Sequence, residues 1–335
     1  MLGLYRLILA ALVALSHAGV GILGLNPGVM AVAGFYLASG YVMTGLLRMH
    51  FPGSAAVWAF YADRALRLGP HYLAVAGLTL LWYWAAPPIG SEYLSAPPTL
   101  GRMLENLLIV PLNFFMFNGA NHFTLIPPAW SLGAEIQFYL IIPFLLLWRL
   151  RLPALVLSLC VFATAANGWI PSDWFGYRLL PGILFVFLLG SYLFDIDRVN
   201  DSGHRRRLVV AVLAAAGVTG VALRFHGTLE LPVNREILLG LAIGVLVLAS
   251  LGHRKRTPLD SWLGNLSYGV FLNHFLIMWS VFGGRVDGPL QLVAFVATSI
   301  AFAALTYYAI ERPLLSYRHR LRSERKVGQG ATVAY

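Results

Sequence analysis

Long apolar runs, each about as long as a bilayer is thick, follow one another along most of this chain. A helix needs about 20 apolar residues to cross the hydrocarbon core. The pattern predicts ten such spans, at residues 2–23, 27–47, 70–86, 130–148, 153–169, 179–194, 208–223, 237–251, 262–282 and 290–310. We therefore expect an all-α, polytopic membrane protein with about ten transmembrane helices.

One further apolar stretch, residues 103–117, is too short and too interrupted for an ordinary crossing. It contains Pro111 and Asn113, and apolar segments of this length are typical of re-entrant or interfacial helices. The pattern therefore adds one short helix of that kind to the ten spans. Residues 1–315 are then expected to form a transmembrane domain, and residues 316–335 a basic cytoplasmic tail that is disordered.

The composition agrees with a membrane protein. The chain is 59% hydrophobic and only 11% charged, whereas about a quarter of the residues of soluble domains are charged. Its single cysteine, Cys160, excludes an internal disulfide. The chain shows no metal-ligand spacing, phosphate-binding loop or dinucleotide-binding glycine pattern. We therefore expect no metal and no permanently bound cofactor.

The positive charge of the chain, formally +10, is explained by membrane topology. Cytoplasmic loops of membrane proteins carry an excess of Lys and Arg. If the amino terminus lies inside, only five of the 24 Lys and Arg residues fall on the outer side, namely Arg102, Arg178, Arg224, Arg235 and Arg285. Both termini are then cytoplasmic, and the basic balance requires no nucleic-acid partner.

Two of the predicted spans carry ionisable residues at a similar depth, past the midplane toward the outer face. An ionisable side chain near the bilayer centre costs at least ~2.5–3.5 kcal/mol, so each is a candidate for function. His17 lies about 16 Å along its helix from Arg6, and Glu135 is just over one turn into a span that enters from outside. A neutral imidazole can act as a general base, and a carboxylate bonded to it would hold its tautomer. The alternatives are a histidine that packs between helices and a glutamate that reaches the outer interface.

Other polar residues are placed near the same depth. Asn273 and His274 lie near mid-depth in a later span, where they either line the same cavity as His17 or serve in packing. Ser131 precedes Glu135 by one helical turn and either contacts these groups or caps its helix.

A pair of arginines precedes the third span at the inner face. Arg64 and Arg67 are three residues apart, so in a helix they share one face. Their guanidinium groups suit phosphate oxygens, and the alternative is ordinary flanking charge. His71, close by, has no evident partner. Glu311 and Arg312, next to a proline, indicate an anchor at the inner face.

In combination these motifs resemble the acyltransferase 3 family of integral membrane acyltransferases. The matching features, in family order, are His17, residues 35–41, Arg64-x-x-Arg67-x-x-Pro70-x-Tyr72, Trp130-Ser131-Leu132-x-x-Glu135, residues 263–274, and Glu311-Arg312-Pro313. They extend over essentially the whole predicted membrane domain. The resemblance implies an enzyme that takes an acyl group from cytoplasmic acyl-CoA and O-acylates surface glycans, lipopolysaccharide sugars, lipids or antibiotics.

The resemblance also implies roles for individual residues. His17 would be catalytic with Glu135 as its companion, and Arg64 and Arg67 would contact the phosphates of the acyl donor. Relatives often have a basic residue where this chain has Asp63, which would weaken a phosphate contact. Further candidate site residues are Ser131, Tyr72, Trp130, Asn273 and His274. The length of the chain resembles the stand-alone form of the family rather than the form with a fused extracytoplasmic hydrolase-like domain.

We therefore predict a membrane O-acyltransferase of the inner or plasma membrane. It would transfer an acyl group, by default acetyl, from acyl-CoA to a hydroxyl of a carbohydrate or glycolipid and so modify a polysaccharide. The alternative is a secondary transporter or flippase in which His17, Glu135 and His274 form a proton relay or a substrate cavity. The acyl chain, the acceptor, the oligomeric state, and the choice between direct transfer and an acyl-enzyme stay open at this point.

Overall fold

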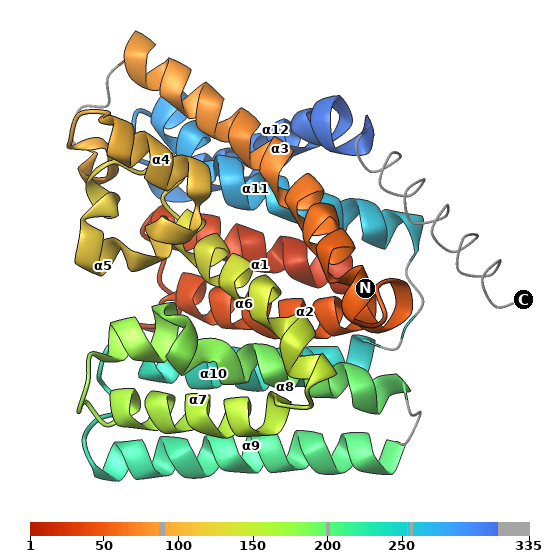
Figure 1. The fold of residues 1–335 in the computed structure, drawn as a ribbon. Coiled ribbons are helices and arrows are strands. Elements are labelled where there is room, and N and C mark those ends of the chain that lie inside the picture. Colours follow the sequence, from red (N-terminus) through yellow and green to blue (C-terminus); the bar gives the residue numbers. More distant parts are fainter. Residues whose placement is uncertain (87–90, 199–201, 253, 255–256, 314–335) are drawn as a thin grey trace, which may run out of the picture.

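The computed structural model describes residues 1–86, 91–198, 202–252, 254 and 257–313 (Figure 1). The predicted tail, residues 316–335, lies outside these residues. Each predicted span coincides with one long helix: α1 (Leu2–His17), α2 (Pro27–His50), α3 (Val57–Ala85), α6 (Ala129–Leu147), α7 (Arg151–Ala166), α8 (Leu180–Arg198), α9 (Ser202–Phe225), α10 (Asn234–Leu251), α11 (Pro258–Phe282) and α12 (Gly288–Thr306). The predicted all-α class is confirmed.

The number of membrane crossings is smaller when it is judged by helix length and apolarity alone. Among the described residues, six helices meet both conditions: α2, α6, α10, residues 174–197 around α8, residues 205–225 of α9, and residues 288–311 around α12. α1 and α7 are apolar but shorter. These criteria therefore support a polytopic membrane protein but do not establish the predicted number of ten.

The segment predicted to be re-entrant or interfacial is a sharply bent pair of helices. α4 (Leu100–Leu108) begins at Thr99, whose hydroxyl caps it, and meets the helical residues 110–118 at an angle of 104°. Ile109 makes the bend with a φ of 65°. A short, broken apolar pair of this kind agrees with the prediction, and it brings the second arm of the pair against α6.

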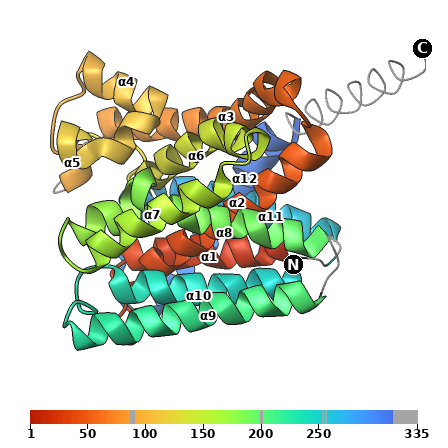
Figure 2. The ribbon, with the colours of Figure 1, turned by 60° about the horizontal axis from the view of Figure 1, so that its bottom comes forward.

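α1 lies at the centre of the bundle, between α2 and α11 (Figures 1 and 2). α11 also packs on α12 and α3, while α2 packs on α8 and α10. α1 and α11 run parallel: the backbone nitrogen of Gly3 donates to Asp260 Oδ1 over 2.9 Å at one end, and the His17 ring stacks on His274 toward the other. This central position gives His17 protein neighbours instead of lipid.

Small residues allow α2 and α8 to approach closely. A Cβ atom on Gly40 would lie 1.8 Å from the carbonyl oxygen of Phe187, and one on Gly190 would lie 1.9 Å from that of Leu37. Close approach through small residues is a usual way for membrane helices to pack. Close packing of α2 on α8 therefore explains why a glycine, Gly40, follows Ser39 in the motif of residues 35–41.

We expect Gly40→Ala to destabilise the protein by about 1–3 kcal/mol, because the added methyl group has only rigid backbone to displace. Thermal unfolding of the detergent-solubilised protein measures the effect as a lower midpoint. Gly77→Ala in α3 is the matched control, since nothing lies within 4 Å of a Cβ there. Equal unfolding midpoints for the two variants would contradict the close crossing.

Candidate active site

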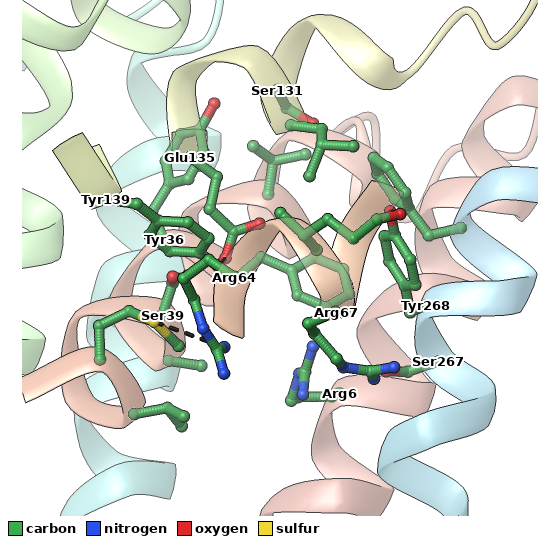
Figure 3. Close-up of a pocket in the computed structure, with 18 of the residues that line it drawn as sticks. Arg6, Tyr36, Ser39, Arg64, Arg67, Ser131, Glu135, Tyr139, Ser267 and Tyr268 are labelled. Carbon is green, nitrogen blue, oxygen red and sulfur yellow. Dashed lines mark hydrogen bonds between the residues drawn. The ribbon is translucent and has the colours of Figure 1, made fainter. Parts of the chain in front are cut away.

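A cavity of about 230 Å³ lies among α1, α2, α3, α6 and α11, and we call it the inner cavity. Arg6 of α1 and Arg64 and Arg67 of α3 line it. Figure 3 shows their guanidinium groups at one end of the cavity, away from Ser131. The shared face predicted for Arg64 and Arg67 is therefore present, and it forms part of a larger cationic cluster at the end predicted to face the cytoplasm.

Arg64 and Arg67 have carboxylate partners. Arg64 pairs with its neighbour Asp63, with 3.1 Å between Nε and Oδ2. Arg67 Nη1 lies 2.5 Å from Glu311 Oε2, and Glu311 Oε1 lies 2.8 Å from His71 Nδ1. The expectation that His71 has no partner is therefore wrong, because its ring is buried against the last helix of the described chain. Glu311 also does more than mark an anchor, since it holds Arg67 in place.

Glu135 lines the inner cavity on α6, and hydroxyl groups hold its carboxylate. Ser39 Oγ donates to Glu135 Oε1 over 2.6 Å, and the Tyr139 hydroxyl donates to the same oxygen over 2.5 Å. No hydrogen bond joins Glu135 to His17 in the described part of the chain. The predicted contact between them is absent because the two residues face different cavities, although they were placed at similar depth.

A second cavity of about 250 Å³, the outer cavity, lies beyond the inner one. His17 lines it together with Trp130 at the start of α6 and Arg178 at the end of the π-helical turn Trp174–Arg178. Its other lining residues include aromatic, amide and hydroxyl side chains, namely Tyr93, Phe115, Tyr177, Asn26, Asn121, Thr124 and Ser16. His17 is therefore accessible to a polar ligand.

Val32 and Ser131 line both cavities, so the two cavities adjoin at these side chains. The Ser131 hydroxyl donates to the carbonyl of Pro128 over 3.0 Å, as expected for a residue in the first turn of α6. A capping side chain would instead accept from a backbone N–H, so the predicted helix cap is absent, while Ser131 still stands at the junction of the two cavities.

His274 and Asn273 are buried between helices and line neither cavity. The His274 ring stacks on His17 with 5.4 Å between ring centres and 19° between planes, and Phe275 packs on the other imidazole at 4.7 Å. His274 Nδ1 bonds to the carbonyl of Val270, and Asn273 donates to the carbonyl of Ser299. Of the two predicted uses, packing is what the contacts support, and His274 thereby orients His17.

Tyr72 is a structural link and not part of either cavity. It is completely buried, and its hydroxyl donates to the carbonyl of Asn106 over 2.8 Å, which ties α3 to α4. Trp130 does line the outer cavity, where its ring lies 4.5 Å from the guanidinium carbon of Arg178.

Among the lining residues that were not predicted as candidates are Arg6, Ser39, Tyr139 and Arg178. Tyr139 follows Glu135 by four residues, and that spacing alone predicts a contact on a helix. Arg6 and Arg178 were counted only as topological charge. The aromatic residues around Arg178 were the available sign that this arginine turns back into the protein.

Residues 3–308 match the model of a family described as "Acyltransferase domain". Similar relatives include a putative membrane-bound transacylase, BcsY, of Komagataeibacter xylinus, 28% identical over 92% of this chain and 81% of its own. The exopolysaccharide production protein ExoZ of Rhizobium meliloti is 26% identical over 86% of this chain and 90% of its own. A putative O-acetyltransferase of Staphylococcus aureus is 23% identical over 86% of this chain and 53% of its own. No solved structure matches the chain.

Proposed function

The chain belongs to the acyltransferase domain family, and from that premise we propose that it transfers an acyl group from cytoplasmic acyl-CoA to a carbohydrate hydroxyl across the membrane. It is a membrane acyltransferase. The observation that carries the proposal is the pair of adjoining cavities, one with three arginines and the other with His17. A thioester held in the first needs only to pass Val32 and Ser131 to meet a hydroxyl in the second.

The inner cavity suits acyl-CoA as donor. Guanidinium groups bind phosphate oxygens through paired N–H donors, and Arg6, Arg64 and Arg67 lie together at one end of the cavity. CoA carries its phosphates far from its thioester, so phosphates at the arginine end direct the pantetheine arm toward Ser131. Ser39 and Tyr139 both bond to one oxygen of Glu135. Among the described residues nothing donates a hydrogen bond to the other oxygen, which can accept an amide N–H of that arm.

The outer cavity suits a sugar as acceptor. It combines the aromatic rings of Tyr93 and Trp130 with the polar groups of Asn26, Asn121 and Thr124, and amphipathic rings next to a few oriented polar groups are typical of selective ligand sites. One relative is named for exopolysaccharide production and another for O-acetyl transfer. We therefore assign a polysaccharide sugar as the acceptor class and acetyl as the acyl group.

His17 is the general base of the proposed reaction. Its imidazole takes the proton of the acceptor hydroxyl while the oxygen attacks the thioester carbon, and it returns a proton to the sulfur when CoA leaves. The stacked ring of His274 holds the imidazole in place. This direct transfer requires no covalent acyl-enzyme.

Acyl-CoA is cytoplasmic, so the arginine end of the inner cavity faces the cytoplasm. This orientation agrees with the placement of Lys and Arg on the inner side. The proposal is therefore a protein of the inner or plasma membrane with Met1 and Pro313 on the cytoplasmic side.

Vectorial transfer in liposomes tests the function. The protein is reconstituted with acetyl-CoA, labelled in the acetyl group, on the arginine side and a polysaccharide acceptor on the other. We expect labelled ester on the acceptor, and one CoA thiol released for each ester formed, with little thiol released when the acceptor is omitted. Movement of the acceptor across the membrane without thioester cleavage would instead identify a transporter or flippase.

A further inference from the structure

Arg178 is a cation that shares the outer cavity with His17. Only 20% of its side chain is exposed, so protein encloses most of this cation. It ends the π-helical turn Trp174–Arg178, a rare conformation that occurs frequently at functional sites. An arginine keeps its charge at every pH the cell offers, so the cavity has a permanent cation next to the candidate base.

Contacts on several sides hold the guanidinium in one orientation. Its Nε donates to Asp173 Oδ2 over 2.8 Å. Its central carbon lies 4.5 Å from the ring centre of Trp130 and 5.1 Å from that of Phe115. In the described part of the chain no hydrogen bond is recorded from its two terminal nitrogens. These nitrogens are therefore available to a ligand of the cavity.

A buried amide fixes the backbone beneath this side chain. Asn113 is fully buried, and its Nδ2 donates to the carbonyls of both Arg178 and Trp130, over 3.0 and 3.1 Å. Its Oδ1 accepts from Gln137 over 2.9 Å. Every polar atom of the Asn113 side chain is thus hydrogen-bonded. The backbone segments at Arg178 and Trp130 are therefore held in a fixed position relative to each other. Donors fixed in advance in this way stabilise developing charge most effectively.

We propose that Arg178 is the oxyanion-binding residue of the acyl transfer, an inference that rests on the proposed function. When the acceptor oxygen attacks, the thioester carbonyl becomes a tetrahedral carbon with a negative oxygen, and His17 holds the acceptor's proton. The terminal nitrogens of Arg178 donate to that oxygen. The carbonyl then re-forms, the carbon–sulfur bond breaks, and the sulfur receives the proton from His17. The products are the acyl ester and free CoA thiol.

Steady-state kinetics of Arg178→Gln and Arg178→Lys in the liposome assay test this role. Loss of one oxyanion donor typically lowers kcat by about 10²- to 10³-fold. We expect a decrease of that size in Arg178→Gln, a smaller one in Arg178→Lys, and unchanged KM values for acetyl-CoA and the acceptor. Arg235→Gln is the matched control, because this arginine is also on the outer side but pairs with Glu230 away from the cavities.

Three outcomes overturn the assignment. A kcat of Arg178→Gln within twofold of wild type means that the residue does not bind the oxyanion. A raised acceptor KM at constant kcat assigns Arg178 to substrate binding instead. If Arg178→Gln no longer binds acetyl-CoA, its fold is lost and Arg178→Lys decides, with an unchanged kcat counting against the role. Wild-type protein without any transfer refutes the proposed function itself, whereas equal rates in wild type and variant refute only the role of Arg178.

Discussion

Replacing His17 with asparagine is expected to lower the rate of acyl transfer by about 10²- to 10⁴-fold, because the general base of the reaction is removed. Asparagine keeps a polar side chain of similar size against His274 and Phe275, so the packing of α1 on α11 changes little. The measurement is kcat for release of CoA thiol in the presence of acceptor. Binding of acetyl-CoA is expected to stay at the wild-type level, since His17 does not line the inner cavity.

His122→Asn is the matched control for this variant. His122 is an exposed histidine in the loop between α5 (Phe115–Asn118) and α6, and it lines neither cavity. Its replacement is expected to leave kcat unchanged. If His17→Asn folds normally and transfers acyl groups as fast as His122→Asn, the imidazole is not the base.

Replacing Arg64 with alanine is expected to raise the KM for acetyl-CoA by about 10- to 100-fold. Loss of one or two charge-assisted hydrogen bonds weakens binding by about that factor. At saturating donor, kcat is expected to recover, because a phosphate contact far from the thioester contributes to binding and not to the chemical step. Removal of Arg64 also takes away the arginine partner of the buried Asp63 carboxylate, so thermal unfolding of the variant is measured beside the KM. Removal of Arg67 also leaves Glu311 buried with His71 as its remaining partner, which costs stability as well.

Arg48→Ala is the control for charge at the same end of the molecule. Arg48 lies in the last turn of α2, is about half exposed, and pairs with Asp195 outside the inner cavity. Its replacement is expected to leave the donor KM unchanged. If Arg64→Ala and Arg48→Ala have the same KM for acetyl-CoA, Arg64 binds no phosphate and contributes only flanking charge that sets the membrane orientation.

The positions of helices along the chain could be predicted from the sequence because hydrophobicity is a local property. Each predicted span coincides with one long helix, and the short interrupted stretch around Pro111 is a bent pair. The position of a residue along its helix was also predictable, since a helix rises by a constant distance per residue. The placement of His17 beyond Arg6, and of the paired arginines at the opposite end from His17, follows from that constant rise.

The direction in which a side chain points across the bundle could not be predicted in the same way. Glu135 and His17 were placed at one depth and were expected to touch, yet one faces the inner cavity and the other the outer cavity. Depth gives only the coordinate along the helix axis. The rotation of each helix about that axis is set by packing, such as the close crossing of α2 and α8 at Gly40.

The sequence by itself determined that this protein is an all-α membrane acyltransferase, and it identified His17, Arg64 and Arg67 as candidates, because apolar length, charge placement and motif order are all readable along one dimension. Only the tertiary structure decided which candidates share a cavity. Arg178 and His17 line the same cavity, and Glu135 accepts hydrogen bonds from Ser39 and Tyr139. Tyr72 lies outside both cavities, where its hydroxyl bonds to α4. These relations join residues far apart in the chain, and only the packing of helices brings such residues together.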